Sequence, residues 1–276
     1  MQNKVPIVSI VLPTQNRAHS LYKSIDSVIN QSFQEWELFV IDNFSTDDTP
    51  KLMEKYCRQD NRIYYYSVPK SKEEGITDYL NFGVEKAKGK YIGRMDDDDY
   101  WYSGDKLKKQ VEFLEKNLEF CVVGGGVILI DSKGNHLFKY YKKEKDEEIR
   151  RFMLFSNPFS HTTVLFRKEV FDKVGGYTTG IIEDWNLWLR MGKTGKMYNF
   201  PEYFTCYTTG GQNLSFKIQR KQAKKILTLI KSFRKDYPNY RKAYFLNLSQ
   251  YIYTYLPEFI RKPLQSFMFY FKRTNF

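Results

Sequence analysis

Four consecutive aspartates, Asp96 to Asp99, form the tightest concentration of negative charge in the chain. Adjacent carboxylates repel one another unless a positive charge lies among them. Carboxylate oxygens suit hard divalent cations, so the run predicts a site for Mg²⁺ or Mn²⁺. Taken alone, the same residues fit a solvated acidic loop, or two N-cap residues ahead of a helix at residues 103–117, equally well.

A second acidic pair, Glu183 and Asp184, stands at the start of a helical pattern whose apolar anchors include Trp185 and Trp188. Two interpretations of this pair stay open. Acidic residues stabilise the positive end of a helix dipole, which would make the pair structural. A carboxylate can also take a proton from a hydroxyl group, which would make the pair a source of general base catalysis.

The segments that lead to the aspartates alternate between strand-like and helix-like patterns. Apolar or extended runs predict strands at residues 7–12, 36–41, 62–68 and 91–95. Apolar residues at helical spacing predict helices at residues 18–31, 49–59 and 76–88. Such alternation indicates an α/β fold with a Rossmann-like, mostly parallel sheet that helices cover on both faces.

Three polar turns follow strands in this scheme, at residues 13–17, 42–47 and 96–99. Ligands of parallel sheets bind outside the carboxyl ends of the strands, so the three turns are expected to converge on one edge. This convergence favours a binding site over a solvated loop.

The second half of the chain predicts a mixed sheet added to the first. Short strands are expected around three glycines, followed by a hairpin turn, a strand, a charged helix and a last strand, at residues 120–123, 127–130, 131–135, 136–141, 145–155 and 162–166. From Phe216 the chain becomes basic and aromatic. We therefore divide it into an α/β domain, residues 1–215, and a helical C-terminal appendage, residues 216–276.

The C-terminal region predicts three helices: one around the apolar residues from Ala223 to Phe233, one over residues 240–255, and one that begins at Pro257. Two interpretations of this basic, aromatic-rich region stay open. Its helices could lie on an anionic membrane surface, or they could pack on the preceding domain.

The chain has 276 residues and a formal net charge of +12, which favours anionic partners. Its three widely spaced cysteines suit reduced thiols better than a disulfide framework. No signal-peptide pattern and no apolar run of about 18 residues occurs, so we expect a cytoplasmic protein without a membrane span. No nucleic-acid partner is expected, because the acidic turns would repel phosphate and no DNA- or RNA-binding motif is present.

Five segments carry a resemblance to a known family. They are Val-Ser-Ile-Val-Leu-Pro-Thr-Gln-Asn-Arg at residues 8–17, Ile-Asp-Asn-Phe-Ser-Thr-Asp-Asp-Thr at 41–49, the acidic motif with its strand at 88–99, residues 157–177, and Glu-Asp-Trp-Asn-Leu-Trp-Leu-Arg at 183–190. In this order they resemble the inverting nucleotide-sugar glycosyltransferases of family two, which have the GT-A fold. The match runs from about Ile7 to Ser215, and residues 1–215 would be the catalytic domain.

The resemblance assigns the polar turns to the donor and its metal. The residues that would bind the nucleotide are Pro13, Thr14, Asn16, Arg17, Asp42, Asn43, Arg94, Asp96 and Asp97, with Asp42 accepting a hydrogen bond from the base. Asp96 and Asp98 would ligate Mn²⁺ or Mg²⁺. The alternative register, in which Asp97 and Asp99 form the working pair, stays open.

The resemblance also assigns catalysis to Asp184 as general base, with Glu183 as the second candidate, and it puts His161 and Trp185 on the acceptor side. Base-assisted single displacement at the anomeric carbon gives inversion. The implied reaction moves a sugar from a nucleotide-sugar donor, UDP-sugar first, to a hydroxyl of a glycan or lipid-linked acceptor in cell-surface polysaccharide synthesis. The implied location is cytoplasmic, with peripheral contact at the inner face of the membrane. The alternative is a catalytically silent module of this fold that binds a nucleotide or glycan.

The sequence departs from the family pattern at two positions. Gly210 stands where members often carry His, so a metal would keep an extra water or use Gln212. Phe44 stands where Gly is usual, and it is expected to reshape the rim of the nucleoside pocket. His161 is the best remaining histidine, with a structural role as its alternative.

Overall fold

The computed structural model describes the chain except for residues 1–4, 69–74, 179–181, 210–218, 258 and 260–276. The described residues form one nine-stranded sheet in the order β3-β2-β1-β4-β8-β6-β9-β5, with β7 paired to β6. The strands are β1 (Val8–Thr14), β2 (Trp36–Asp42), β3 (Ile63–Ser67), β4 (Tyr91–Arg94), β5 (Tyr100–Trp101), β6 (Phe120–Ile130), β7 (His136–Tyr140), β8 (Leu165–Arg167) and β9 (Lys196–Thr208). The helices are α1 (Ala18–Ile29), α2 (Thr49–Gln59), α3 (Ile76–Lys86), α4 (Lys106–Lys116), α5 (Asp146–Phe152), η1 (His161–Thr163), α6 (Lys168–Lys173), α7 (Glu183–Met191), α9 (Gln219–Ser232) and α10 (Tyr240–Tyr253).

The N-terminal half of the sheet is parallel, as the alternation predicts. β1 lies between β2 and β4, and β3 pairs with β2. Thr14 pairs with Asp42 and Val11 pairs with Arg94, so the three central strands end beside one another. The turns that follow these strands therefore meet at one edge of the sheet.

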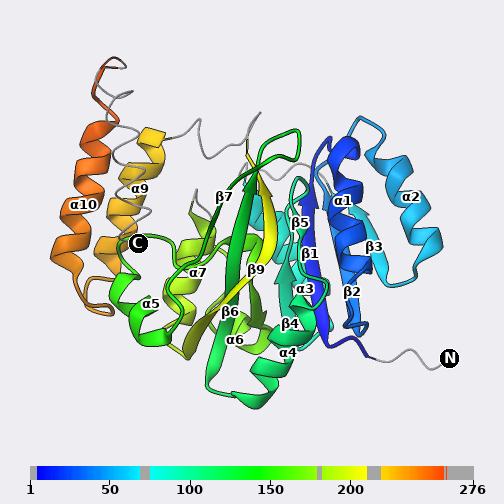
Figure 1. The fold of residues 1–276 in the computed structure, drawn as a ribbon, viewed down its shortest axis with the longest axis horizontal. Coiled ribbons are helices and arrows are strands. Elements are labelled where there is room, and N and C mark those ends of the chain that lie inside the picture. The colour runs from blue at the N-terminus through cyan, green and yellow to red at the C-terminus, as the bar shows by residue number, and fades with distance from the viewer. Residues whose placement is uncertain (1–4, 69–74, 179–181, 210–218, 258, 260–276) are drawn as a thin grey trace.

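Helices cover both faces of this sheet, as Figure 1 shows. Val8, Ile10 and Leu12 of β1 belong to one buried cluster, which α1, α2 and α4 complete. Val11 points to the opposite face and belongs to a second cluster, with residues of α3, α5, α6 and α7. Every residue of β1 is buried, which explains its continuous apolar run.

The second half of the sheet is mixed, as expected, but its details differ. β8 pairs antiparallel with both β4 and β6, whereas β6 and β9 are parallel. The predicted break at the three glycines is wrong, because β6 runs unbroken from Phe120 to Ile130. A side chain at Gly124 or Gly125 would collide with the ring of Phe159 or Phe204, so these glycines permit close packing within a strand.

Two further expectations for this half need correction. The strand predicted at residues 162–166 begins only at Leu165, because Thr162 and Thr163 form the 3₁₀ turn η1. The residue pattern gives no sign of β5, which has only two residues, or of the bounds of β9. β9 carries polar residues and Pro201 among its apolar ones, so neither strand periodicity nor an apolar run reveals it.

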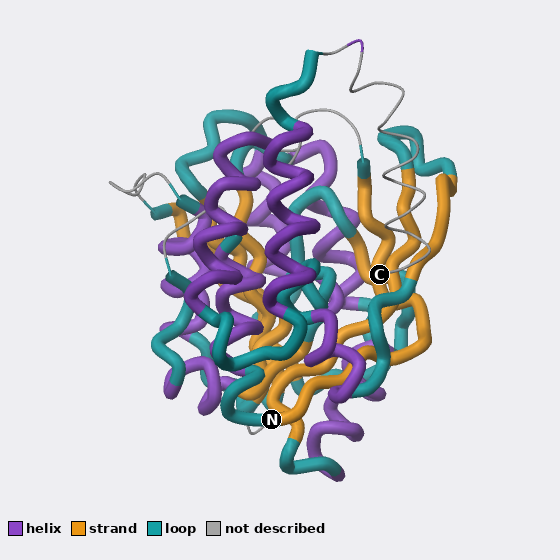
Figure 2. Tube along the Cα trace, turned by 90° about the vertical axis from the view of Figure 1, so that its left-hand side faces the viewer, coloured by secondary structure: helices purple, strands orange, loops and turns teal. Residues whose placement is uncertain are grey.

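The C-terminal helices α9 and α10 lie at the opposite end of the molecule from α2, and Figure 2 shows them side by side. Their inner face shares the cluster of α7: Leu229, Ile230 and Ala243 are buried there. The Tyr237 hydroxyl between the two helices donates to the Leu189 carbonyl oxygen of α7 (2.8 Å). The packing interpretation is confirmed for this face. The third helix, expected from Pro257, falls outside the described residues except for Pro257 and Phe259.

Within the part of the chain that the structure describes, no helix combines the length and the apolar character that crossing a membrane requires.

Candidate active site

The polar turns after β1 and β2 are locked to each other by backbone and side-chain hydrogen bonds. The Asn16 amide donates to Ser45 Oγ (2.8 Å), and the Thr46 amide donates to Asn16 Oδ1 (2.7 Å). At the start of α1, the Ala18 amide donates to Asp47 Oδ2 (3.1 Å). These contacts make the two turns one continuous rim at the carboxyl edge of the sheet.

Two residues of this rim have a left-handed backbone, Asn16 with φ of 53° and Phe44 with φ of 50°. Asparagine tolerates this region, whereas a bulky residue adopts it at a cost of about 1 kcal/mol or more. A glycine would adopt this backbone without strain. The Phe44 side chain is 58% exposed, so no burial of its ring offsets that cost.

Asp42 lies below the rim at the end of β2 and is completely buried. Its Oδ1 accepts hydrogen bonds from the amide and the hydroxyl of Ser45, and its Oδ2 accepts one from the Tyr65 hydroxyl. The carboxylate therefore fixes the shape of the turn that follows β2. The sequence expectation that Asp42 accepts a hydrogen bond from a base stays a prediction, and the structure adds this positioning role.

The other residues expected around the nucleoside also lie at this edge. Pro13 and Thr14 are buried within the last two positions of β1. Asn43 accepts a hydrogen bond from the Tyr79 hydroxyl of α3 at its Oδ1 (2.7 Å), and its amide donates to the Thr14 carbonyl oxygen (2.9 Å). These three residues hold the ends of β1 and β2 together beneath the exposed rim.

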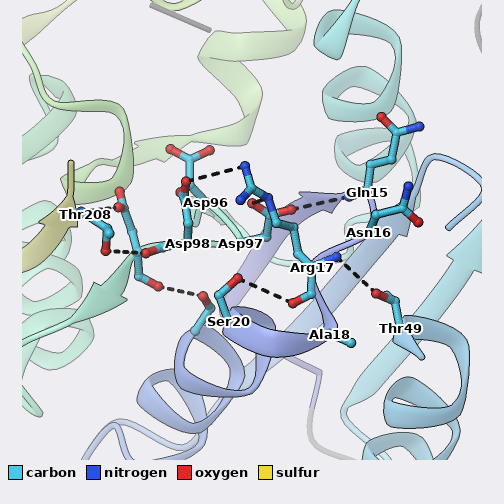
Figure 3. A network of polar contacts seen from close by, with 12 residues as sticks. Gln15, Asn16, Arg17, Ala18, Ser20, Thr49, Asp96, Asp97, Asp98 and Thr208 are labelled. Carbon is cyan, nitrogen blue, oxygen red and sulfur yellow. Dashed lines mark hydrogen bonds and ion pairs between the residues drawn. The ribbon is translucent and has the colours of Figure 1, made fainter. Parts of the chain in front are cut away.

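Arg17 connects this rim to the acidic segment, as Figure 3 shows. Its Nε lies 3.7 Å from Asp97 Oδ1 and its Nη2 lies 3.9 Å from Asp98 Oδ2, so the guanidinium lies between two carboxylates. Asp97 Oδ2 also accepts a hydrogen bond from the Gln15 amide (3.3 Å). Burial raises the pKa of Asp97 to about 6, and the charge of Asp98 adds to that rise.

Asp99 differs from the three aspartates before it, because its side chain is turned into the protein and is 1% exposed. Its Oδ1 accepts a hydrogen bond from the Thr208 amide of β9 (2.9 Å). The Thr208 hydroxyl donates to the Asp98 carbonyl oxygen (2.6 Å), so one threonine holds two residues of the segment (Figure 3). Burial, followed by the charges of Asp96 and Asp98, raises the pKa of Asp99 well above its ordinary value.

Arg94 ends β4, and its side chain is 2% exposed. Its Nη2 donates to Asp96 Oδ1 (2.5 Å). Its charge also acts on Asp98, His161 and Glu183, which come from three other parts of the chain. The structure thus brings the acidic segment and the start of α7 within electrostatic reach of one arginine.

The acidic pair Glu183 and Asp184 forms the first turn of α7. Asp184 Oδ2 accepts a hydrogen bond from Asn157 Nδ2 (2.6 Å), and its Oδ1 accepts one from the Trp185 amide (2.7 Å). Burial raises the pKa of Asp184, and the charge of Asp96 adds to the rise while the two hydrogen bonds oppose it. Burial and the charge of Asp184 raise the pKa of Glu183 to about 7.

His161 lies beside the same cluster, with its Nε2 2.8 Å from the Tyr177 hydroxyl. Burial, and then the charge of Arg94, lowers the pKa of His161 well below its ordinary value, so its imidazole is neutral. The phenol of Tyr177 is buried and feels the charges of Arg94 and Asp184. These two rings therefore adjoin the place where the acidic segment and α7 meet.

Trp185, which the resemblance puts on the acceptor side, is a core residue. Its side chain is 4% exposed and belongs to the hydrophobic core, and its indole Nε1 donates to the Met153 carbonyl oxygen (2.8 Å). The structure gives this side chain a packing role, and its place on the acceptor side stays a prediction. Trp185 still serves the site, because its amide holds the Asp184 carboxylate.

The acidic segment offers a cation few but suitable ligands. Asp96 and Asp98 keep 31% and 25% of their side chains exposed, and like charge from Asp96 contributes to the raised pKa of Asp98 after burial. The described residues hold no group of three or more His, Cys, Asp or Glu side chains that could bind a metal ion. Two carboxylates with substrate phosphates and water match the way that Mg²⁺ and related ions bind. Gln212 and Gly210 fall outside the described residues.

Several residues of the site escape the sequence analysis as functional groups. They position other side chains, and they are Ser45, Tyr65, Asn157, Tyr177 and Thr208. Asn157 and Tyr177 lie in segments that the family resemblance covers, so the motifs could have pointed to them. Thr208 and Tyr65 sit in strands with no signal of their own, and only the folded arrangement reveals their contacts.

Comparison with known proteins decides the family. The family model "Glycosyl transferase family 2" matches residues 9–175. This chain belongs to glycosyl transferase family 2. Among its curated relatives, EpsE of Bacillus subtilis (strain 168), named as a glycosyltransferase, is 32% identical over 206 residues, 72% of each chain. WbnJ of Escherichia coli, named as an O-antigen biosynthesis glycosyltransferase, is 32% identical over 188 residues, which are 67% of this chain and 71% of WbnJ. The chain is therefore a glycosyltransferase.

Solved structures confirm the GT-A fold of this family 2 glycosyltransferase. The structure of TarS 1-349 from S. aureus covers 88% of the chain with a TM-score of 0.65 at 18% identity, and the match spans 71% of that protein. The mannosyltransferase PcManGT from Pyrobaculum calidifontis, solved with GDP-Man and Mn²⁺, covers 90% with a TM-score of 0.63 at 18% identity, and the match spans 70% of its chain. At this identity the likeness concerns the fold alone.

Proposed function

We propose that this glycosyltransferase uses a divalent metal ion and transfers a sugar, with inversion, from a nucleotide-sugar donor to a hydroxyl of a glycan or lipid-linked acceptor. A UDP-sugar is the first candidate donor, and cell-surface polysaccharide synthesis is the proposed setting. Residues 1–215 would form the catalytic domain. The observation that carries the proposal is that two acidic motifs lie within electrostatic reach of each other, since the charge of Asp96 acts on both Glu183 and Asp184.

The donor would bind along the carboxyl edge of the sheet. We assign the nucleoside to the rim formed by the turns after β1 and β2, where Asn16, Asp42 and Asn43 are held in place. Arg17 and Arg94 would then lie near the charged part of the donor, beside Asp97 and Asp96. Such a placement agrees with the general location of ligands in open parallel sheets.

Asp96 and Asp98 are the residues that would hold the metal ion, because both stay partly exposed whereas Asp99 is buried and bound to Thr208. This difference favours the register Asp96 with Asp98 over Asp97 with Asp99. When bound, the ion would supply positive charge to the phosphates of the leaving group. Mn²⁺ and Mg²⁺ both suit two carboxylates, and PcManGT was solved with Mn²⁺.

Asp184 is our candidate for the general base. Hydrogen bonds from Asn157 and from the Trp185 amide fix its carboxylate and stabilise the ionised form, which is the form that accepts a proton. Glu183, whose pKa is raised to about 7, is the second candidate because a smaller fraction of it is ionised at neutral pH. A base that removes the proton of the acceptor hydroxyl during direct attack yields inversion.

The relatives support the setting and the donor class. WbnJ is named for O-antigen biosynthesis, and TuaG of Bacillus subtilis (strain 168) is named for teichuronic acid biosynthesis. TarS 1-349 was also solved with UDP-GlcNAc, whereas PcManGT was solved with GDP-Man. Both nucleotides therefore belong in a donor screen, with UDP-sugars tested first.

The test is a thermal-shift screen of UDP-sugars and GDP-mannose in Mn²⁺, in Mg²⁺ and in EDTA, because a ligand of the folded state raises its melting temperature. We expect stabilisation by one donor that depends on the metal. Asp98→Ala should abolish the metal-dependent part, whereas Asp172→Ala, which removes an exposed carboxylate of α6, should keep it. Equal donor affinity for Asp98→Ala and wild type in Mn²⁺ would defeat the metal assignment.

Turnover separates the enzyme from a silent binding module of the same fold. Incubation of the best donor with Mn²⁺ and a panel of glycan and lipid-linked acceptors should release the nucleoside diphosphate, and NMR of the product should give the inverted anomer. A retained anomer would overturn the single-displacement mechanism. Binding without release across the panel and without slow donor hydrolysis would favour the silent module.

We also propose that the outer face of α10 contacts the anionic inner face of the cytoplasmic membrane. Phe245 and Ile252 are spaced two helical turns apart and are 69% and 54% exposed, with the exposed Arg241 and Lys242 beside them. Residues 219–257 contain nine lysines and arginines and one acidic residue, Asp236. An apolar stripe flanked by basic groups suits the surface of an anionic bilayer.

Deleting the C-terminal region would expose the core that it shares with α7, so the membrane test uses surface substitutions. The double variant Phe245→Ser and Ile252→Ser should bind vesicles that contain phosphatidylglycerol about tenfold more weakly, or more weakly still. Burial of apolar surface contributes about 25 cal/mol per Å², and the two substitutions remove the apolar surface. Thr228→Ser, an exposed change on α9, serves as the control. Equal sedimentation of the double variant and the wild type with these vesicles would refute the contact.

A further inference from the structure

Arg94 is an incompletely paired buried cation. Its side chain is 2% exposed, and its Nη2 is bound to Asp96. Its Nε and Nη1 are buried, and neither has a hydrogen-bond partner among the residues that the structure describes. Buried donors without partners are uncommon in proteins, because each has lost its water and gained nothing in return.

The position of Arg94 shows what its free N–H groups could serve. The residue ends β4, one position before the acidic segment, and its charge acts on His161 and on Glu183 at the start of α7. Under the proposed function, the pyrophosphate lies at the acidic segment and the attacking acceptor hydroxyl lies at Asp184. The donor sugar must lie between these two places, which is where the Arg94 guanidinium is held.

The surrounding charges restrict the kind of sugar. Asp96, Asp98, Glu183 and Asp184 are four carboxyl groups within reach of this site, and the first already occupies one edge of the guanidinium. A divalent ion on Asp96 and Asp98 would offset two of these charges, but the donor pyrophosphate would bring two more, so a sugar with its own carboxylate would still add negative charge to this group at a low local dielectric. Neutral hydroxyl groups can accept hydrogen bonds from the N–H groups of these two unpaired nitrogens without that repulsion.

We propose that Arg94 recognises the sugar ring of the donor through its Nε and Nη1, and that the donor sugar is a neutral one and not a uronic acid. This inference rests on the proposed function and deepens it. Arg94 is then a specificity-determining residue. Its guanidinium binds Asp96 through Nη2 and keeps the N–H groups of Nε and Nη1 for hydroxyl groups, a division that the single ammonium group of lysine cannot reproduce.

The experiment measures binding by calorimetry in Mn²⁺, with the full chain and two sets of probes. The first set is UDP and GDP alone. The second set is UDP-glucose, UDP-galactose, UDP-GlcNAc, UDP-glucuronic acid and GDP-mannose. We expect a neutral donor to bind tightest. In Arg94→Lys, affinity for that donor should fall about tenfold or more while affinity for its free nucleotide changes less than twofold, since charged hydrogen bonds discriminate at this level.

Arg94→Met is a second test variant, which removes the charge of the side chain. The matched control lies at the other end of the strand pair β4 and β8. Arg167→Lys changes a buried arginine of β8 whose guanidinium nitrogens all have partners, and it should leave the ratio of donor to free-nucleotide affinity unchanged. Tightest binding of UDP-glucuronic acid would overturn the neutral-sugar assignment. An equal loss for donor and free nucleotide in Arg94→Lys would make the residue a pyrophosphate ligand or a structural one, and would overturn the proposal.

Failure of the proposed function gives a different result. In that case neither the free nucleotides nor the sugar nucleotides bind the wild type in Mn²⁺, and the Arg94 variants have nothing to alter. Binding of free nucleotide with a selective loss of the sugar nucleotide in Arg94→Lys is therefore specific to the inference.

Discussion

Two buried arginines lie at opposite ends of one pair of strands, and their surroundings differ in a way that separates structure from function. β4 and β8 run antiparallel, with Tyr91 opposite Arg167 and Gly93 opposite Leu165. Arg167 therefore lies at the start of β4, and Arg94 lies at its end. Their exposures are 4% and 2%, so burial alone does not distinguish them.

Arg167 has a partner for every guanidinium nitrogen. Its Nε donates to the Phe120 carbonyl oxygen (2.7 Å), its Nη2 donates to the Leu114 carbonyl oxygen (2.6 Å), and its Nη1 lies 3.4 Å from the Tyr91 hydroxyl. Leu114 is in the last turn of α4, where carbonyl groups lack helical partners and the helix dipole is negative. At this end the buried cation caps a helix, and its charge is compensated by backbone groups.

Arg94 has one partner and two unpaired nitrogens, in a group that also brings several carboxylates close together. Such an arrangement opposes stability, because both the unpaired donors and the like charges cost free energy. Proteins keep arrangements of this kind where a ligand later satisfies them. The contrast teaches that local polar imbalance, more than burial or charge, marks the functional end of this sheet.

The largest expected effect tests the functional end through its base. Asp184→Asn keeps the size of the side chain and removes its capacity to accept a proton, so transfer should fall about 10²-fold or more while donor affinity stays within twofold. The measurement is release of nucleoside diphosphate at saturating donor and acceptor, paired with calorimetry of donor binding.

The control for this variant is Asp172→Asn, which makes the same chemical change on an exposed residue of α6 that pairs with Lys168. It should retain full activity. A wild-type rate for Asp184→Asn would move the base to another residue, with Glu183→Gln as the next variant to assay.

The second prediction compares the stability of the two ends directly. Arg167→Met removes the hydrogen bonds to three carbonyl groups, which are buried or partly buried, so the free energy of unfolding should fall by about 3 kcal/mol or more. Arg94→Met removes one ion pair but also two unpaired donors, so its free energy of unfolding should change by less than about 1 kcal/mol. Urea unfolding of both variants in EDTA measures the difference.

A large loss of stability in Arg94→Met with little change in Arg167→Met would invert the comparison. It would mean that Arg94 stabilises the folded state and that its unpaired nitrogens do not serve to bind a ligand. The transfer rate is a second measurement of the same contrast. Arg94→Met should lose transfer activity, whereas the folded fraction of Arg167→Met should keep it.

The parallel half of the fold follows from the sequence because its central strands β1 and β2 are buried on both faces and are mostly apolar. β1 and the pattern of α1 are examples. The same rule fails in the second half for a physical reason. β6 contains three glycines that read as a turn, yet aromatic rings from other segments fill the space beside them. β9 mixes polar and apolar residues, because its neighbours cover it unevenly.

The site divides in a similar way. Motif chemistry suffices to propose Asp96, Asp98 and Asp184, since carboxylates at strand ends and helix starts leave a trace in the sequence. It cannot show that Asp99 turns inward to Thr208, or that Trp185 is buried, because those facts depend on strand β9 and on the packing of α7. The unpaired nitrogens of Arg94 are equally invisible in the sequence, since pairing is a property of three-dimensional neighbours.

The third prediction uses pH to compare a glutamate from each end. At the functional end, burial and Asp184 raise the pKa of Glu183 to about 7, so the folded state favours its protonated form. Stability from this group is fully present below pH 4.5 and is lost as pH rises through 7. Glu183→Gln should therefore gain stability over the wild type between pH 5 and 7.5, by on the order of 2 kcal/mol.

Glu115 of α4, at the Arg167 end, should show the opposite sign. Its hydrogen bond from Lys90 lowers its pKa, so its contribution is present above the unfolded value and disappears as pH falls through the folded one. Glu115→Gln should lose stability relative to the wild type at neutral pH, and the difference should shrink below about pH 4. Urea unfolding in EDTA across this range measures both variants. If the stability difference from the wild type changed with pH in the same direction for Glu183→Gln and Glu115→Gln, the distinction between the Arg94 end and the Arg167 end would be contradicted.

The smallest expected effect concerns backbone strain. At the functional end, Phe44 has φ of 50° and an exposed ring, so Phe44→Gly removes strain and should raise the free energy of unfolding by about 0.5–1 kcal/mol. At the other end, Gly89 has the opposite relation to its surroundings: an added Cβ would lie 2.6 Å from the Ser9 backbone nitrogen, so Gly89→Ala should destabilise.

Calorimetry of the nucleoside diphosphate with Phe44→Gly decides what the strain is for. A weaker complex together with a more stable protein would mean that the ring is held in a costly conformation because it contacts the ligand. Unchanged affinity with higher stability would leave Phe44 without a role in the nucleoside pocket, and would confine the functional end to the residues around Arg94 and α7. Lower stability would show that the ring packs favourably despite its exposure, and the strain argument would then fail at this position.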